Sequence, residues 1–420
     1  MSQELILIGR AFVNGNLKET EIGISEGKIT YVGPSAGRGD RRIDLGSNRI
    51  ILPGGVDPHV HFRDPGMTHK EDFGTGSASA ISGGITCVLD MPNTIPPAVD
   101  RETVVEKKAR LRKRSYCDYG LFAAITANSR PSKVADLVAG YKLFMGSTTG
   151  KILTNDDNVI ADMVGEVMNL GKVLSVHAED DNMILKGTER NCTDHLRNRP
   201  AAAEANAIRR LSKFKGGKIN ICHLTTVEGL NLAKSYGFTT EVTLHHIMFS
   251  SDRGSDAKYK VNPPLRESAA REALFKAFEQ GEITMFGSDH APHALSEKEN
   301  EFDLAPSGMP GVETTLPILM NTVRKGTLPL SRVVEMCSTA PARVFGMNKG
   351  SVEVGKDADF SVFNLQNRKE IKGDCLHSKA GYTPYEGREA VFPDMVLLRG
   401  EMQLKDGEFC GETMGADIIG

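Results

Sequence analysis

The residues of this sequence that could do chemistry are histidines, acids and one lysine at the ends of short apolar runs. His59 and His61 form a His-x-His pair, which places both imidazoles on the same side of an extended strand. Later runs end in His177, His223 and Asp289. Imidazole and carboxylate ligands without cysteine suit Zn²⁺ or a similar divalent ion in a catalytic site with an open position. A lone His-x-His pair is common by chance, but these additional strand-terminal residues favour a metal site.

Lys142 lies inside the apolar run 141–145 and needs a separate explanation, because an ammonium group repels a metal ion. Its amine can react with CO2 to form a carbamate, an anion whose two oxygens can bridge two metal ions. The alternative is a lysine that pairs with a neighbouring acid. Asp156 and Asp157, a little downstream, are reserve candidates for the bridging role.

These residues must be positioned by the strands and helices that the sequence pattern predicts. The apolar runs that we expect as strands are 50–56, 85–90, 119–125, 141–145, 173–177, 219–223, 240–249 and 283–288. The segments that we expect as helices include 100–115, which Asp100 can cap, and 155–170, 200–214, 226–236 and 268–280. About eight such repeats predict a (β/α)8 TIM barrel, whose active site forms at the carboxyl ends of the strands. A doubly wound open sheet is the alternative, but no glycine-rich nucleotide loop follows any run.

Both ends of the chain have a different sequence pattern, in which short apolar runs alternate with Gly and Asn turns. This pattern is typical of short antiparallel strands. We therefore expect residues 1–50 and 346–420 to form one split β-sandwich domain, and residues 51–345 to form the barrel.

Composition excludes several classes of protein. The chain of 420 residues has 51 Lys+Arg against 54 Asp+Glu, so its formal net charge is −3, which argues against a nucleic-acid binder. The basic tract 107–114 fits the solvated face of a helix. Seven cysteines without a CxxC pair indicate a reducing compartment. Because no apolar run reaches membrane-spanning length and no signal peptide is evident, we expect a cytoplasmic protein without membrane contact.

Taken together, the motifs resemble those of the dihydroorotases, a family of the amidohydrolase superfamily. The likeness spans residues 50–345, and the flanking β segments also resemble that superfamily's split sandwich. The matching motifs, in family order, are His59-Val-His61-Phe-Arg63-Asp-Pro-Gly, Met91-Pro-Asn93, Tyr141-Lys142-Leu-Phe-Met-Gly, His177-Ala-Glu-Asp, His223-Leu-Thr-Thr, Val261-Asn262-Pro-Pro-Leu-Arg266 and Gly287-Ser-Asp289-His-Ala-Pro-His293.

The resemblance implies a role for each matching residue. The metal ligands that it implies are His59, His61 and Asp289 on the first Zn²⁺, the carbamate of Lys142 as a bridge, and His177 and His223 on the second Zn²⁺. In the family a water or hydroxide lies between the metals, and Asp289 exchanges its proton as general acid and base. The substrate contacts that it implies are Arg63, Asn93 and His293 on a carboxylate, and Asn262 and Gly308 on the ring edge. Some family members use an aspartate in place of the lysine, which leaves the metal count open.

The implied reaction is the reversible cyclisation of N-carbamoyl-L-aspartate to L-dihydroorotate and water, a step of de novo pyrimidine (UMP) biosynthesis. Arg63 separates this reaction from those of hydantoinases and allantoinases, because a guanidinium can hold the extra carboxylate through two parallel hydrogen bonds. Alternatively, Arg63 pairs with Asp64 or Glu71. Another alternative is an inactive relative that acts as an assembly partner, although every expected metal ligand is retained. Expected partners are the small-molecule substrate and either further copies of the chain or other pyrimidine-pathway enzymes.

Other features of the sequence have structural interpretations. At most one of His245 and His246 can face the barrel mouth, because adjacent strand residues point to opposite sides. By the same rule Cys222 faces away from His223 and is a small buried hydrophobe. Glu179 and Asp180 support the loop of His177 by hydrogen bonding. Segments 146–155 and 294–310 are candidates for a loop that closes over the substrate.

Overall fold

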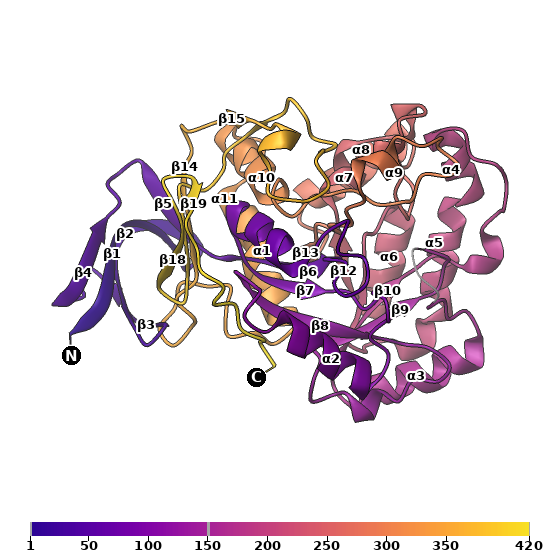
Figure 1. Cartoon of the computed structure of the whole chain (residues 1–420), viewed down its shortest axis with the longest axis horizontal. Helices are drawn as coiled ribbons and strands as arrows, with labels where there is room; N and C mark the ends of the chain where they lie inside the picture. The colour runs from indigo at the N-terminus through magenta and orange to yellow at the C-terminus, as the bar shows by residue number, and fades with distance from the viewer. Residues whose placement is uncertain (1, 149–151, 420) are drawn as a thin grey trace.

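The computed structural model describes residues 2–148 and 152–419, which form a barrel with a smaller β domain beside it (Figure 1). Within these residues, eight parallel strands pair in chain order. They are β6 (Gly55–Val60), β7 (Ile85–Asp90), β8 (Asp118–Ala124), β9 (Gly140–Phe144), β10 (Val173–His177), β11 (Ile219–Ile221), β12 (Thr239–Val242) and β13 (Met285–Phe286). A parallel bridge between Val60 and His290 closes the sheet. The (β/α)8 barrel is therefore confirmed, and the open doubly wound sheet is wrong.

The connections between the strands carry most of the helices (Figure 1). The α-helices of the described residues are α1 (Phe73–Ser82), α2 (Arg101–Leu111), α3 (Asp157–Asn169), α4 (Cys192–Asn198), α5 (Ala201–Arg210), α6 (Val227–Tyr236), α7 (Leu244–Met248), α8 (Ser268–Glu279), α9 (Leu295–Lys298), α10 (Thr315–Arg324), α11 (Leu330–Val334) and α12 (Ala340–Val344). Asp100 caps α2 as predicted, because its side chain accepts a hydrogen bond from the Thr103 amide at 2.9 Å. Gly237 ends α6 in the left-handed conformation. None of the described helices combines the length and apolar character that crossing a membrane requires.

The small domain is built from both ends of the described chain. Its strands in one nine-stranded sheet are β1 (Gln3–Val13), β2 (Asn16–Ser25), β3 (Lys28–Gly33), β4 (Gly39–Asp44), β5 (Arg49–Pro53), β14 (Phe360–Asn364), β17 (Met395–Leu398), β18 (Glu401–Lys405) and β19 (Glu408–Phe409). A separate pair consists of β15 (Lys369–Glu370) and β16 (Glu389–Ala390). The two ends meet where β5 pairs antiparallel with β14, with Ile51 opposite Val362. Both of these side chains are buried in a core of the small domain.

The apolar run 50–56 is divided between the two sheets, which the sequence pattern did not predict. Its first part is β5 of the small domain, and its second part is β6 of the barrel. Gly54 separates them, and a Cβ at this position would lie 2.3 Å from Oγ1 of Thr86. Only glycine allows so close an approach. The expected domain limits stay a prediction. Because β5 and β6 belong to different sheets, the structure favours Gly54 as the first junction between the domains.

Candidate active site

A small cavity lies among residues that follow or end the barrel strands, and its volume of about 30 Å³ is enough for a water or an ion. Its lining residues in the described chain are His59, His61, Arg63, Asn93, Lys142, Phe144, Thr148, His177, His223, Asn262, Asp289, Ala291, Ser307 and Gly308. Every residue assigned to the site from the sequence is therefore in the lining except His293. The structure thus gathers ten of those residues around one space.

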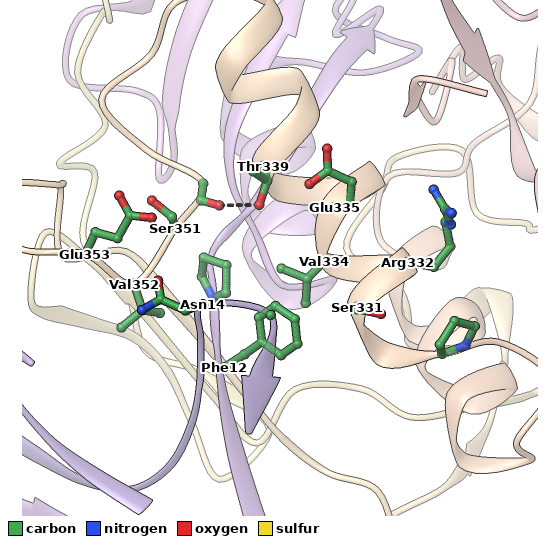
Figure 2. A pocket seen from close by; sticks show the side chains of 14 residues that line it. Phe12, Asn14, Ser331, Arg332, Val334, Glu335, Thr339, Ser351, Val352 and Glu353 are labelled. Carbon is green, nitrogen blue, oxygen red and sulfur yellow. Dashed lines mark hydrogen bonds between the residues drawn. The ribbon is translucent and has the colours of Figure 1, made fainter. Parts of the chain in front are cut away.

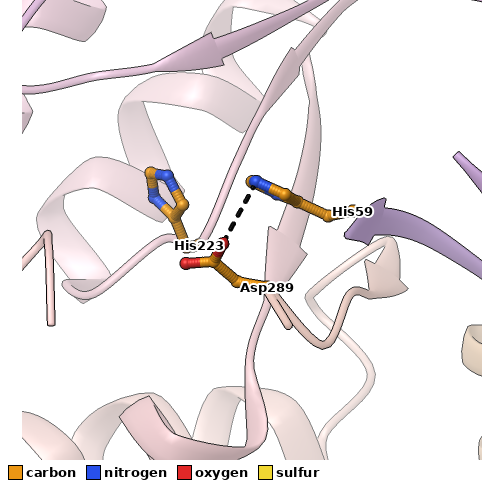
Figure 3. A group of neighbouring side chains, drawn as sticks. All are labelled: His59, His223 and Asp289. Atoms are coloured by element: carbon orange, nitrogen blue, oxygen red, sulfur yellow. Dashed lines mark ion pairs between the residues drawn. The ribbon is translucent and has the colours of Figure 1, made fainter. Parts of the chain in front are cut away.

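The first group of potential metal ligands comes from opposite ends of the barrel sequence. His59 lies on β6, His61 follows it, and Asp289 follows β13. Oδ1 of Asp289 lies 3.4 Å from Nε2 of His59 and 3.1 Å from Nε2 of His61. Figure 3 shows the carboxylate of Asp289 between the rings of His59 and His223. These separations suit donors that converge on one ion with bonds of about 2.0–2.2 Å.

The second group is a pair of facing imidazoles. His177 ends β10, and His223 follows β11. Nδ1 of His177 and Nε2 of His223 lie 3.0 Å apart. Nδ1 of His223 is buried and has no hydrogen-bond partner among the described residues. The two facing nitrogens are therefore a second place where donors converge.

Hydrogen-bond partners fix the orientation of three of the histidines from behind. Oε1 of Glu241, on β12, lies 2.7 Å from Nδ1 of His59. Oδ1 of Asn93 lies 2.6 Å from Nδ1 of His61. Such contacts leave the opposite ring nitrogen free to bind a metal. Glu241 was missed by the sequence reasoning, although a glutamate inside the apolar run 240–249 was a signal that could have revealed it.

His177 has the strongest support. Its Nε2 lies 2.8 Å from Oε2 of Glu179, and the same oxygen accepts a hydrogen bond from Nη2 of Arg199 at 2.5 Å. All three side chains are buried. Burial raises the pKa of Glu179, but Arg199 and His177 outweigh this effect, so the net pKa is lowered and the carboxylate is charged. The predicted support of His177 by Glu179 is therefore present, whereas Asp180 caps a short turn and bonds Arg210.

Burial controls the protonation of the other titratable groups. It lowers the pKa of His59, His61 and His223, so these imidazoles are neutral, which is the form that binds a metal. It raises the pKa of Asp57 and of Glu241 to about 7. The site therefore combines neutral imidazoles with carboxylates that a nearby cation would keep ionised.

The backbone is left-handed at three residues of the site. The φ angles are 60° at Arg63, 35° at His223 and 45° at Asp289. Side chains other than glycine rarely adopt this conformation, and it occurs at functional sites where the surroundings enforce it. At His223 the turn corrects our expectation for Cys222, which faces the cavity side and not the opposite face. Sγ of Cys222 lies 3.1 Å from Nζ of Lys142.

Lys142 is fully buried on β9, and its Nζ has no carboxylate within ion-pair distance among the described residues. The alternative of a lysine paired with an acid is therefore wrong. The reserve candidates for the bridge are also wrong, because they lie on the surface at the start of α3. Asp156 caps that helix, and Asp157 pairs with Arg210 at 2.8 Å.

Arg63 is buried beside the metal-ligand candidates and does not pair with Asp64 or Glu71. Asp64 instead pairs with Arg114 at 3.0 Å. Within the described residues, the hydrogen bond that Arg63 donates to a carbonyl runs from Nε to Pro292 at 3.2 Å. Burial lowers the pKa of Arg63 to about 10, so the guanidinium is charged at neutral pH. It is a cation whose remaining N–H groups are available to a ligand.

His293 lies behind Arg63 and not in the cavity lining. Its Nε2 is 3.0 Å from the carbonyl of Ser307, and its Nδ1 is 3.0 Å from Nζ of Lys70. The carbonyl can only accept and the ammonium can only donate, so His293 carries its proton on Nε2. His293 therefore orients its surroundings, and its expected contact with a substrate carboxylate stays a prediction.

The remaining predicted residues have mixed outcomes. Asn262 lines the cavity, and its buried Oδ1 has no hydrogen-bond partner in the described chain. Gly308 lines it too, but its amide already donates to the carbonyl of Lys260 at 2.9 Å. His245 and His246 lie on the one-turn helix α7 and not on a strand, so the strand argument about them was wrong. Of the two loop candidates, segment 146–155 lies partly outside the described residues.

The site fits divalent cations. Four neutral imidazoles, one carboxylate and a buried lysine converge there, and one buried imidazole nitrogen has no partner in the described part of the chain. A second cluster of acids does not fit a metal ion; it consists of Asp118, Asp357 and Asp359. Nζ of Lys349 lies 2.6–2.8 Å from each of those carboxylates and already supplies the positive charge.

A larger cavity of about 400 Å³ lies elsewhere, between the small domain and the helices after residue 330 (Figure 2). Among its charged residues, Glu335 pairs with Arg343 at 2.8 Å. Thr339 donates its hydroxyl to the carbonyl of Gly350 at 2.8 Å. No histidine lines this cavity in the described residues. Size therefore does not identify the active site, and the convergence of donors does.

Comparisons with known proteins agree with this choice. The amidohydrolase family matches residues 50–401. A dihydroorotase of Methanosarcina mazei is 40% identical, covering 94% of this chain and 92% of the relative. A dihydroorotase of Pyrococcus abyssi is 39% identical, covering 99% and 98%. Among solved structures, the L-hydantoinase of Arthrobacter aurescens is similar with a TM-score of 0.92 and 27% identity over all of both chains. A D-hydantoinase from Thermus sp. has a TM-score of 0.86 and 26% identity, covering 99% and 98%.

Proposed function

The chain belongs to the amidohydrolase family, and we propose that it acts there as a dihydroorotase. It interconverts N-carbamoyl-L-aspartate and L-dihydroorotate, with water as the second product of ring closure. The observation that carries the choice is Arg63, a buried cation without a carboxylate partner among the described residues, beside the converging histidines. Hydantoin and dihydropyrimidine rings lack the carboxylate that such a cation would bind.

We assign the cavity to two Zn²⁺ ions on the basis of its donors. The residues that would hold them are His59, His61 and Asp289 for one ion, His177 and His223 for the other, and a CO2-derived carbamate on Lys142 between them. When bound, such ions supply Lewis-acid stabilisation of negative charge on the reacting carboxyl group and lower the pKa of water. The burial of Lys142 without an acid partner among the described residues supports the carbamate, because the modification turns a buried cation into an anion.

Asp289 moves the proton. Its Oδ1 faces Nε2 of both His59 and His61, so Oδ2 is the oxygen left to take a proton from water and return it to the ring nitrogen. The strained backbone at Asp289 aims this carboxylate into the cavity and away from the strand direction. Proton transfer in both directions by one residue accounts for a reversible reaction.

Arg63 orients the substrate. Its guanidinium forms two parallel hydrogen bonds with the ring carboxylate, which fixes the reacting amide relative to the ligand cluster. Asn262 offers to an N–H group of the ring its buried Oδ1, which has no partner among the residues that the structure describes. Asn93 and His293 support substrate binding indirectly, by positioning their neighbours. Asn93 contacts His61, and His293 contacts the loop at Ser307.

The deciding experiment measures cyclisation of N-carbamoyl-L-aspartate and zinc content on the same preparation. We expect turnover that tracks zinc occupancy, and little hydrolysis of hydantoin or dihydrouracil. Turnover of those rings at a comparable kcat/KM would favour a hydantoinase, and full metal loading without turnover on any ring would favour an inactive assembly partner. For the carbamate, Lys142→Ala should be partly rescued by added short carboxylic acids, and unchanged activity of that variant would contradict the bridge.

The cellular setting is a further part of the proposal. All seven cysteines are free, and five of them are buried. Free thiols suit the reducing cytoplasm, where we place the enzyme. Its partner is a small-molecule substrate, and its association with further copies or with other enzymes of pyrimidine synthesis can be tested by light scattering and co-purification.

A further inference from the structure

A buried lysine outside the ligand cluster holds the loop that borders the cavity. Lys298, at the end of α9, is 2% exposed. Its Nζ donates hydrogen bonds to the carbonyls of Pro306 at 2.8 Å, Gly308 at 2.9 Å and Lys260 at 3.2 Å. An ammonium group has three donors and no acceptor, so three carbonyls satisfy it completely. A buried cation destabilises the folded state unless such bonds compensate for the lost hydration. We therefore infer that Lys298 has a role at this buried position.

The carbonyl between these two loop acceptors is bound by another side chain of the site. Ser307 accepts from Nε2 of His293 at 3.0 Å. Three successive carbonyls, at residues 306, 307 and 308, thus accept hydrogen bonds from Lys298 and His293. The amide of Gly308 is tied as well, to the carbonyl of Lys260 at 2.9 Å. The loop therefore has little freedom to move at the point where Ser307 and Gly308 line the cavity.

This loop and Lys70 together hold the ring of His293, the histidine behind Arg63, with its proton on Nε2. Because Nε2 of His293 donates a hydrogen bond to the carbonyl of Ser307, that nitrogen cannot accept one from Nη2 of Arg63, 3.3 Å away. If the loop moved, the His293 ring would lose its contact with Ser307 and could flip, which would turn the lone pair of Nδ1 away from Lys70 and toward an N–H group of Arg63. The guanidinium would then have fewer donors for a substrate carboxylate.

We propose that Lys298 is a positioning residue that fixes loop 306–308 and, through Ser307 and His293, keeps the Arg63 guanidinium free for the substrate carboxylate. This inference rests on the proposed dihydroorotase function. It makes substrate affinity depend on a side chain that touches neither the substrate nor the ligand cluster. A merely structural lysine would instead affect stability and turnover without separating KM from kcat.

Lys260, which follows the short turn 257–259 earlier in the chain, provides a matched control. It is also a buried lysine, but its Nζ binds the carbonyls of Phe302 and Asp303 and the carboxylate of Glu189 at 3.1 Å. Those groups are not in the cavity lining. Lys260→Met therefore removes another buried cation that binds the loop, at residues 302 and 303, and leaves the bonds of Lys298 to residues 306 and 308 in place.

The test compares steady-state kinetics of L-dihydroorotate hydrolysis for wild type, Lys298→Met and Lys260→Met, with zinc content and Tm measured on each. For Lys298→Met we expect KM to rise about tenfold while kcat changes by less than about threefold, because binding is lost equally from ground state and transition state. Zinc content should equal that of wild type. Lys260→Met should lower Tm but leave KM within about twofold of wild type.

Other outcomes overturn the inference. A KM within about twofold of wild type in folded, zinc-loaded Lys298→Met would show that the loop does not depend on this side chain. An equal KM increase in both variants would assign the effect to general loosening. Should Lys298→Met fail to fold, Lys298→Gln is measured instead, and an unchanged KM there would also refute the inference. Failure of the proposed function is distinguishable, because wild type itself would then not turn over L-dihydroorotate.

Discussion

Glu241→Gln isolates the charge that stands behind the first histidine ligand. Oε1 of Glu241 lies 2.7 Å from Nδ1 of His59, and Oε2 lies 3.3 Å from Nδ2 of Asn220. The pocket around it is tightly filled, since a Cβ at Gly287 would lie 2.6 Å from the Glu241 carboxyl carbon. A glutamine has the same shape, so its amide oxygen can still accept the proton of His59. Only the charge and one acceptor are lost.

The size of the effect follows from these contacts. Removing a hydrogen-bond partner of a metal-binding histidine typically weakens metal binding about 10–100-fold. Because glutamine keeps a neutral hydrogen bond to His59, we expect Glu241→Gln to weaken zinc binding near the lower end of this range, by about tenfold or ~1.4 kcal/mol. Glu241→Ala leaves Nδ1 of His59 buried and unpaired, so we expect it near the upper end, about 100-fold or ~2.7 kcal/mol.

The assay is zinc competition against a chromophoric chelator at about pH 8, above the pKa of about 7 that burial gives Glu241. Glu282→Gln is the matched control, because this glutamate is half-buried away from the site and pairs with Lys234 at 2.9 Å. It should bind zinc as wild type does. A zinc Kd for Glu241→Gln within about twofold of wild type would refute the reasoning. The reasoning would also fail if Glu241→Ala lost no more zinc affinity than Glu241→Gln.

Three further predictions concern the substrate, the proton and the fold. Arg63→Met should raise KM for L-dihydroorotate by about 100-fold in initial-rate measurements, with no comparable change for inhibitors that lack a carboxylate. Asp289→Asn should retain most of its zinc by elemental analysis but lose at least about 100-fold in kcat, and near-normal turnover would contradict its assignment. Burial raises the pKa of Glu189, but His195 and Lys260 outweigh this and lower it to about 2, below its ordinary 4.5. The charge of Glu189 therefore stabilises the fold fully above about pH 4.5, and this stabilisation decreases as the pH falls toward 2. In urea unfolding, Glu189→Gln should be about 1 kcal/mol less stable than wild type at pH 7 and close to wild type at pH 2.5.

The barrel and its ligand positions could be predicted because both depend on repeating patterns. Alternation of apolar runs with helices gives eight strands, and the rule that their carboxyl ends meet brings His59, His177 and His223 together. A strand period of two also places His59 and His61 on one side. The division of run 50–56 could not be seen in this way, because both halves are equally apolar and only tertiary pairing assigns them to different sheets.

The supporting groups were harder to predict because they depend on local backbone turns. The left-handed φ of 35° at His223 breaks the strand alternation, so Cys222 faces Lys142, contrary to the period-two rule. Glu241 and Asn93 act on histidines far away in sequence, and no spacing pattern records such contacts. Sequence periodicity therefore identifies what points into a barrel, while hydrogen-bond partners require the folded chain.

The pairing of β5 with β14 also has a consequence for how the protein is made. Residues 49–53 emerge from the ribosome long before their partners 360–364, and at about 5–20 residues per second the interval is roughly 15 to 60 s. During this time one edge of β5 presents unpaired amides and carbonyls while the whole barrel is being synthesised. Such an edge is a template for pairing with another nascent chain. Slow or crowded synthesis should therefore favour aggregation through the small domain, and not through the barrel that carries the chemistry.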